Sequence, residues 1–487
     1  MKKIGVIGAG FSSLSAATHL AKNGYDVHVF DNHSMAGGRA RKFEVDGFVF
    51  DMGPSWYWMP DVFEQYFGQF GKHPSNYYNL VRIDPSYKIF FQNEEVNIPS
   101  NLNELKDLFE KWEPGSAKNL DKFLIEAEIK YDLGMNRLVH KPGKSLAEFA
   151  EWDVFKGLFK LNIFSSFKSY TSKYFKDERI LQILEFPILF LGATARTTPA
   201  LYSLMNYADI KLGTWYPMGG MHKIVEGMQS LAEEVGVNFH FNSAVKKIKT
   251  ANHRAESLLV NDQIIEFDSI VAGADYHFVE SELLEAESRN YSEDYWNKRE
   301  LAPSSLIFYL GVDKKIENLE HHNLFFDEDF GLHAKELYET PMWPTAPLFY
   351  VCAPSKTDDS VAPKGKENLF ILMPLAPGIE DNEAVRDKYF DLMIDRIEKR
   401  TGASFKENIS YKRSYGISNF KKDYNAYKGN AYGLANTLRQ TAILKPSIRN
   451  KKIKSLYYTG QLTVPGPGVP PSLISGKLVA NEIIKQR

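Results

Sequence analysis

Two short apolar runs near the start of the chain, separated by a stretch of helical periodicity, predict a strand–helix–strand unit. Lys3 to Ile7 (KIGVI) has too little alternation for a half-exposed strand and indicates a buried, parallel one. Apolar residues from Leu14 to Ala21 recur at helical spacing, which predicts a helix over residues 11–23 that Gly24 ends. Tyr25 to Phe30 (YDVHVF) predicts the second strand.

The same two patterns recur along the rest of the chain. Further strands are expected at residues 47–51, 237–248, 264–267, 269–273, 306–310, 368–373 and 454–459, and further helices at residues 222–234 and 473–484. Residues 237–248, 264–267 and 269–273 are expected to belong to one sheet. Strands that alternate with helices predict an α/β fold.

Length and composition narrow the class of protein. A chain of 487 residues favours two or three domains. The net charge of −2 gives no global field that would hold a nucleic acid, so no nucleic-acid partner is expected. Cys352 is the only cysteine, which excludes an intramolecular disulfide and fits a reducing, cytoplasmic compartment. The aromatic content of 14% suits a large apolar cavity or an interfacial face.

The first strand–helix turn has the residues of a dinucleotide-binding site. Gly8 permits the tight turn, Gly10 lets the backbone approach a pyrophosphate, and the helix N-terminus offers unpaired amides to the phosphate charge. Ser13 stands where a third glycine is usual, and its small side chain still allows the helix to pack closely on the strand. Asp31 is placed to accept hydrogen bonds from a ribose hydroxyl. The alternatives are a glycine-rich turn that binds nothing and a short signal peptide beginning at Lys2.

Two further motifs favour FAD over NAD. Gly37-Gly-Arg-Ala40 follows the second strand and places a guanidinium where it can reach a diphosphate or ribose. Near the end of the chain, Pro465 to Ser472 (PGPGVPPS) joins an expected strand to an amphipathic helix and presents a second helix N-terminus to a polar group. Surface loops are the alternative for both. If the first and last motifs close on one ligand, the cofactor domain is discontinuous.

Longer stretches carry a resemblance to a known family: Gly38-Arg-Ala with Asp51-Met-Gly-Pro-Ser, Pro354 to Gly365, Tyr427 to Gly433, and Thr459 to Gly476. In order and spacing they closely resemble the bacterial-type phytoene desaturases, which are FAD-dependent carotenoid desaturases of the amine oxidase superfamily. The resemblance covers nearly the whole chain. This sequence departs from the family pattern at two positions: Ser13 replaces the third glycine of the turn, and Pro467 stands where many members have glycine. Gln461 stands where the wider superfamily usually has an acid, which argues against a monoamine oxidase.

The resemblance implies an α/β fold with two parts. A discontinuous, Rossmann-like FAD-binding domain would comprise residues 1–85, 211–280 and 425–487. A mixed-sheet and helical domain, residues 86–210 and 281–424, would take the substrate and associate with a membrane. The residues expected to bind FAD are Gly8, Gly10, Phe11, Ser12, Asp31, Gly38, Arg39, Gly53, Pro54, Val245, Gly460, Gln461, Gly468, Val469 and Pro470.

The implied reaction desaturates an acyclic C40 carotene, taking phytoene toward lycopene. A hydride passes from an allylic carbon to FAD and a proton leaves the neighbouring carbon, with oxygen or a quinone as the final electron acceptor. This chemistry needs an electron sink and an apolar channel. Trp56, Tyr57 and Trp58 follow the Gly-Pro turn and are candidates for the channel wall, with ordinary core packing as the alternative.

No metal site and no catalytic residue are assigned from the sequence. His321-His322 lacks a partner at helical spacing and is interpreted as a loop or structural pair. Asp51, Arg196 and Asp209 are interpreted as structural, so the proton acceptor is left open.

An apolar C40 substrate is practically insoluble in water and must come from a membrane. Phe155 to Tyr170 interleaves lysines with aromatic residues, and the apolar run Ile180 to Ala193 follows. Such a segment can lie in an anionic interface or pack on the core. We expect peripheral association through Phe155–Ala193 at the inner face of the cell membrane and, because no run of ~18 apolar residues exists, no transmembrane helix.

Other functions fit the same motifs. Within the family these are a desaturase of a later hydroxylated or monocyclic carotene and a carotene cis-trans isomerase. Outside it they are a flavin oxidase of amines, which needs a polar pocket, and a nucleotide-binding module without turnover.

Overall fold

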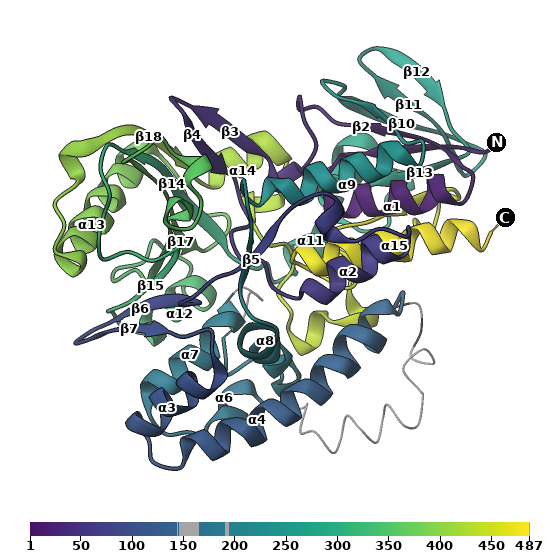
Figure 1. Cartoon of the computed structure of the whole chain (residues 1–487). Helices are drawn as coiled ribbons and strands as arrows, with labels where there is room; N and C mark the ends of the chain where they lie inside the picture. Colours follow the sequence, from purple (N-terminus) through teal and green to yellow (C-terminus); the bar gives the residue numbers. More distant parts are fainter. Residues whose placement is uncertain (144, 146–164, 190–193, 487) are drawn as a thin grey trace.

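A computed structural model describes residues 1–143, 145, 165–189 and 194–486 (Figure 1). Within them, a parallel sheet of five strands contains both the first and the last strand of the chain. Its order is β19–β13–β1–β2–β9. The strands are β1 (Lys3–Ile7), β2 (Asp26–Phe30), β9 (Asn238–His240), β13 (Ser269–Ala272) and β19 (Leu456–Tyr458). All five fall within predicted strands, which confirms those predictions.

Three helices pack together beside this sheet. α1 (Phe11–Lys22) lies between α9 (His222–Glu234) and α15 (Val469–Ile484) (Figure 1). The predicted range of α9 is confirmed at both ends. The prediction that the last helix begins at Leu473 is wrong, because Val469-Pro-Pro already forms its first turn, where proline's missing N–H has no partner to lose.

The prediction that residues 264–267 share a sheet with 269–273 is also wrong. β12 (Gln263–Glu266) pairs with β11 (Arg254–Val260), which pairs with β10 (Val245–Ala251), in a separate antiparallel sheet. Asn261 and Asp262 both have positive φ values, 44° and 70°, as two-residue hairpin turns require. The tight turn folds β12 back on β11, so only β13 enters the parallel sheet.

A mixed sheet of seven strands forms the other half of the structure. Its order is β18–β14–β17–β16–β15–β6–β7. The strands are β6 (Tyr87–Phe91), β7 (Glu95–Ile98), β14 (Ser304–Val312), β15 (His322–Phe326), β16 (Phe349–Cys352), β17 (Glu367–Leu375) and β18 (Ile409–Tyr415). β14 and β17 confirm the strands predicted at 306–310 and 368–373, and they pair antiparallel.

Helices cover the mixed sheet and extend beyond it. α13 (Glu383–Thr401) buries Met393, Ile394 and Ile397 against the apolar side chains of β14 and β17. The other α-helices among the described residues are α2 (Pro60–Gly68), α3 (Leu102–Trp112), α4 (Ser116–Tyr131), α6 (Phe167–Thr171), α7 (Glu178–Leu189), α8 (Leu204–Asn206), α10 (Tyr276–Phe278), α11 (Glu293–Asn297), α12 (Phe330–Tyr338) and α14 (Ile417–Tyr424). Two small ribbons complete the strands: β3 (Lys42–Val45) with β4 (Phe48–Asp51), and β5 (Leu80–Arg82) with β8 (Trp215–Pro217).

The strands of the two large sheets come from different parts of the chain. The parallel sheet draws on residues 1–85, 211–280 and 425–487, and the mixed sheet on 86–210 and 281–424. The division into two domains along these boundaries stays a prediction.

The segment expected to meet a membrane lies partly outside the described residues, which omit 146–164 and 190–193. In its described part most of the apolar side chains are buried in the protein, among them Phe167 and Tyr170 on α6, and Ile180, Ile183 and Leu184 on α7. They serve the core rather than an exposed face. Among the described helices, none has the length and apolar character that a bilayer span requires.

Candidate cofactor and substrate site

The β1–α1 turn leaves a helix N-terminus open to a ligand. Gly8 has φ +88°, and its amide donates to the Phe30 carbonyl over 2.7 Å, which sets the tight turn. Gly10 is the N-cap of α1 and provides no side-chain cap, so the first amides of the helix are not satisfied by a capping group. A Cβ on Gly10 would meet nothing within 4 Å. The turn therefore offers open space and free N–H groups to an anion.

Ser13 on α1 is accommodated by Gly273, the residue that follows strand β13. Its side chain is completely buried on α1. Gly273 faces it from the end of β13, and a Cβ on Gly273 would lie 1.9 Å from Ser13 Oγ. The close helix–sheet contact that a third glycine usually allows is thus preserved by moving the glycine to the opposite surface.

Asp31 stabilises the turn with both carboxylate oxygens. Oδ2 accepts from the Ala9 amide at 2.8 Å, and Oδ1 accepts from the His33 amide at 2.8 Å. Since each carboxylate oxygen can accept more than one hydrogen bond, these contacts leave capacity for another donor. Its contact with a ribose stays a prediction.

The Gly37-Gly-Arg-Ala40 motif lies directly on the first turn. The Gly37 amide donates to the Ala9 carbonyl at 2.8 Å, and a Cβ on Gly38 would be 3.3 Å from Gly10 Cα. Gly53 packs directly against the motif: a Cβ on Gly53 would be 2.4 Å from the Arg39 carbonyl oxygen, so only glycine allows this contact. Segments far apart in the sequence therefore converge on one turn.

Arg39 provides the strongest indication of an anionic ligand. Its Nε is buried and has no hydrogen-bond partner, while Nη2 donates to the Asn430 carbonyl at 3.3 Å. Burial lowers the pKa of this guanidinium, with the charge of Asp275 opposing the shift. A half-buried cation whose buried Nε is a spare donor, next to an open helix N-terminus, fits the diphosphate of FAD.

The last helix approaches the same place from the other end of the chain. A Cβ on Gly476 would lie 2.1 Å from the Ser12 carbonyl, so α15 can touch α1 only because glycine stands there. Ser475 Oγ accepts from the Gly460 amide at 3.1 Å. Gly468 is the N-cap of α15 and, like Gly10, provides no side-chain cap. The first and last motifs thus lie side by side, although Pro470 and Pro471 leave the first turn of α15 with few N–H groups.

The remaining predicted cofactor residues have ordinary structural contacts. Gln461 Nε2 donates to Asn430 Oδ1 at 3.1 Å. Val245 begins β10, and the Ser243 amide just before it donates to the Asp31 carbonyl at 2.7 Å, which places this segment beside the end of β2. Pro54 is half-buried. Direct contact of each with FAD stays a prediction.

An apolar cavity of about 50 Å³ lies between the mixed sheet and helices α7 and α12. Its lining is aromatic and aliphatic apart from one histidine: Phe186, Pro303, Leu324, Phe326, Phe330, His333, Ala334, Leu337, Leu348, Phe349, Tyr350, Leu372, Pro374 and Tyr432. His333 Nδ1 accepts from the Leu348 amide at 3.0 Å and Nε2 donates to the Pro374 carbonyl at 3.2 Å. Burial lowers its pKa to about 4, so this imidazole is neutral.

Two of the three channel candidates contact residues that line this cavity. The Trp56 ring contacts Tyr350 and Phe186, with centroids 5.5 and 5.9 Å apart, and Trp58 contacts Phe186 at 6.2 Å. Tyr57 packs elsewhere, on Phe63 at 4.5 Å. Because Trp56 follows Gly53-Pro54 by two residues, it connects the cavity to the turn next to the FAD motifs.

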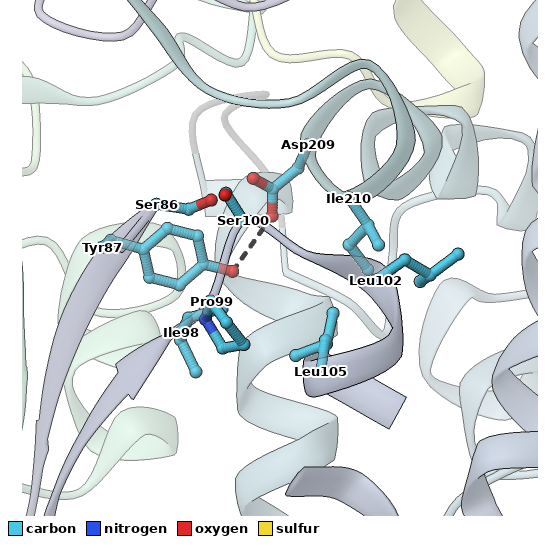
Figure 2. Close-up of a pocket in the computed structure, with 9 residues that line it drawn as sticks. All are labelled: Ser86, Tyr87, Ile98, Pro99, Ser100, Leu102, Leu105, Asp209 and Ile210. Atoms are coloured by element: carbon cyan, nitrogen blue, oxygen red, sulfur yellow. Dashed lines mark hydrogen bonds between the residues drawn. The ribbon is translucent and has the colours of Figure 1, made fainter. Parts of the chain in front are cut away.

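The aspartates interpreted as structural have structural partners. Asp51 accepts from the Met221 and His222 amides at 2.7 and 2.8 Å and so caps α9, while burial raises its pKa to about 6. Asp209 accepts from the Tyr87 hydroxyl at 3.0 Å beside a small cavity (Figure 2). Arg196 is exposed.

Sequence reasoning missed a compact group of three side chains in the mixed sheet. His321 lies in the bend before β15 and His322 opens the strand, and both are buried. Cys352 is the register partner of His322 on β16. One nitrogen of each imidazole and the Cys352 sulfur lie within 4.8 Å of one another. The histidine pair was visible in the sequence, but strand register supplied the third member.

Fold and site together define a Rossmann-type flavoprotein. Comparison with known proteins agrees: residues 11–484 match the family described as flavin containing amine oxidoreductase. The chain is 41% identical over 485 residues to a carotenoid 3,4-desaturase of Haloarcula japonica, covering 99% of this chain and 97% of that one. It is 30% identical to a zeta-carotene-forming phytoene desaturase of Myxococcus xanthus, covering 99% and 94%.

Solved structures share the fold. Putrescine oxidase has a TM-score of 0.61 at 14% identity, with 99% of each chain covered. The chain belongs to the flavin containing amine oxidoreductase family and, within it, to the carotenoid desaturases. It is an FAD-dependent oxidoreductase, which confirms the predictions of FAD, of the fold class and of the family.

Proposed function

We propose that this protein desaturates a carotenoid. Each round breaks two C–H bonds and forms one C=C bond: a hydride leaves one carbon with its electron pair, and a proton leaves the neighbouring carbon. Bound FAD supplies the two-electron acceptor for the hydride. The observation that carries the proposal is the identity of 41% over nearly the full length of a carotenoid 3,4-desaturase.

For the substrate, the comparison favours a later carotenoid over phytoene. The 3,4-desaturase relative is markedly more similar than the phytoene desaturase relative, at 41% against 30% identity. We therefore propose an already conjugated carotenoid that is desaturated near its end group. Phytoene, the substrate that the sequence resemblance implied, is the second candidate.

The side chains around the apolar cavity would hold the polyene. Among the described residues that line it, none offers a carboxylate or ammonium group to bind a charged substrate, and the His333 imidazole is neutral and already paired. Burial of the hydrocarbon there would exclude water from the reacting carbons. At about 50 Å³ the cavity is much smaller than a C40 molecule, so the substrate must displace side chains to enter.

The test is anaerobic reduction of the FAD-loaded protein by carotenoids supplied in liposomes. We expect flavin bleaching and a product lacking two hydrogens with a conjugated acyclic carotenoid such as lycopene, and less of both with phytoene. A small amine is the matched control, and bleaching by it alone would overturn the proposal. Rearranged double bonds without loss of hydrogen would indicate an isomerase. Reoxidation by oxygen or by a quinone would identify the acceptor.

We also propose peripheral attachment to the inner face of the cell membrane, because an insoluble polyene must be delivered from lipid. Ile125 and Ile129 support it: they are 60% and 50% exposed and lie one helical turn apart on α4. Co-sedimentation with anionic liposomes should fall on changing both to serine. If the wild-type protein does not co-sediment with the liposomes, the proposed membrane attachment is rejected.

A further inference from the structure

Three buried side chains of metal-binding type meet where β15 and β16 pair. His321 is 2% exposed, His322 is fully buried and Cys352 is 4% exposed. The antiparallel register places His322 opposite Cys352, and one nitrogen of each histidine lies with the sulfur within 4.8 Å. Their backbones belong to adjacent segments of a hydrogen-bonded sheet, so this arrangement is fixed by the fold.

The two imidazoles each have one nitrogen engaged and one unused. His321 Nδ1 contacts Thr357 Oγ1 at 2.8 Å, and His322 Nδ1 contacts the Tyr350 hydroxyl at 2.7 Å. Both Nε2 atoms are buried without a hydrogen-bond partner. If Nδ1–H donates to the hydroxyl, each Nε2 presents a lone pair. Metal-binding histidines are commonly oriented in this way by a second hydrogen bond.

Two carboxylates lie near the group. The carboxylate of Asp358 acts on His321, and that of Asp51 acts on Cys352. Both carboxylates are held by backbone amides, from Gly219 at 2.5 Å and from Met221 at 2.7 Å. Two fixed carboxylates lower the cost of placing a cation in a buried site.

We propose that His321, His322 and Cys352 bind a zinc-class divalent ion through two imidazole nitrogens and one thiolate. Nitrogen and sulfur ligands exclude Mg²⁺ and Ca²⁺, which prefer oxygen, and suit Zn²⁺ with a fourth position open. Binding displaces the Cys352 proton to solvent. The ion would join β15 to β16 beside the substrate cavity, because Tyr350 contacts both the site and the cavity.

Co²⁺ is the probe, because its visible bands report ligand type and geometry. Metal-free, FAD-loaded protein is titrated with Co²⁺, and metal content is measured after gel filtration. We expect one ion per chain, tetrahedral bands to the red of the flavin absorption, and displacement by Zn²⁺. Cys352 is the only cysteine in the chain, so any thiolate-to-Co²⁺ band must come from it.

Two variants sharpen the test. Cys352→Ser should abolish the thiolate band, and Tyr350→Phe, which removes the hydroxyl that contacts both His322 and Cys352, should weaken binding by about 10- to 100-fold. If the wild type shows neither the tetrahedral bands nor the thiolate band and retains no metal after gel filtration, the proposal is overturned. This outcome does not depend on whether a variant folds. Bound cobalt without the thiolate band would indicate surface histidines and would also overturn it.

Discussion

At the scale of single residues, the contact between Ser13 and Gly273 shows how a motif can change and still work. The serine occupies the position of the third glycine, and the space for its side chain exists because the facing residue, Gly273, has none. Each residue therefore restricts what the other can be.

Gly273→Ala should destabilise the protein by about 1–3 kcal/mol, because the new methyl group overlaps Ser13 Oγ. Ser13→Gly in the same chain should recover most of that loss, since the nearest remaining atom, the Ile7 carbonyl oxygen, is 3.2 Å away. Urea unfolding of the two single variants and the double variant measures this coupling. Additive losses would show that the two positions do not interact.

Asp209 should make stability depend on pH. Burial raises its pKa from 3.8 to about 7, so between these values the folded protein binds more protons at this site than the unfolded chain. Stability from this group is therefore full below pH 3.8 and is lost as pH rises toward about 7.

Asp209→Asn removes this titration while its amide oxygen can still accept from Tyr87. The melting temperature of the variant relative to the wild type should rise as pH increases from about 4 to 7 and then level off. A difference that is constant over this window would mean that Asp209 titrates normally.

At the scale of elements, two helices from opposite ends of the chain pack against each other. α1 and α15 touch through Gly476, and both begin at a glycine without a side-chain cap. Patterns within each segment predicted both helices, but nothing in either segment specifies that they touch.

Gly476→Ala should push α15 away from α1, because its Cβ would meet the Ser12 carbonyl at 2.1 Å. We expect a loss of about 1–3 kcal/mol in stability and weaker FAD binding, followed by flavin fluorescence. Gly68→Ala is the matched control: this glycine is also helical, and a Cβ there meets nothing within 4 Å. Equal effects of both changes would argue against the helix contact.

At the scale of the whole molecule, the residues predicted to bind FAD come from the beginning, the middle and the end of the chain. Arg39 is the residue where binding and folding should oppose each other, because its buried Nε lacks a partner in the protein.

Arg39→Met should leave the FAD-free protein as stable or more stable, since a half-buried charge with an unpaired, buried Nε is removed. The same change should weaken FAD binding, so the rise in melting temperature on adding FAD should shrink. Arg396→Met is the control: Arg396 pairs with Asp327, so its loss should lower stability and leave FAD affinity unchanged. An unchanged FAD-induced shift in Arg39→Met would remove Arg39 from the cofactor site.

The sequence by itself determined several of the elements and the kind of cofactor. The β1–α1–β2 unit, α9 and the strands β14 and β17 follow from short-range periodicity and turn residues, which are local properties of the chain. The glycine turns and Arg39 indicated FAD for the same reason. Local patterns gave the wrong sheet for β12. It is close to β13 in sequence, but a hairpin turn pairs it with β11 instead.

Only the tertiary structure decided which distant residues meet. Gly273 lies opposite Ser13, Gly476 lies against Ser12, and Cys352 lies opposite His322. Each contact depends on strand register or helix packing between segments that are far apart in the chain. Register is set by burial of whole faces rather than by the residues that it brings together, so these contacts arise from the packed fold.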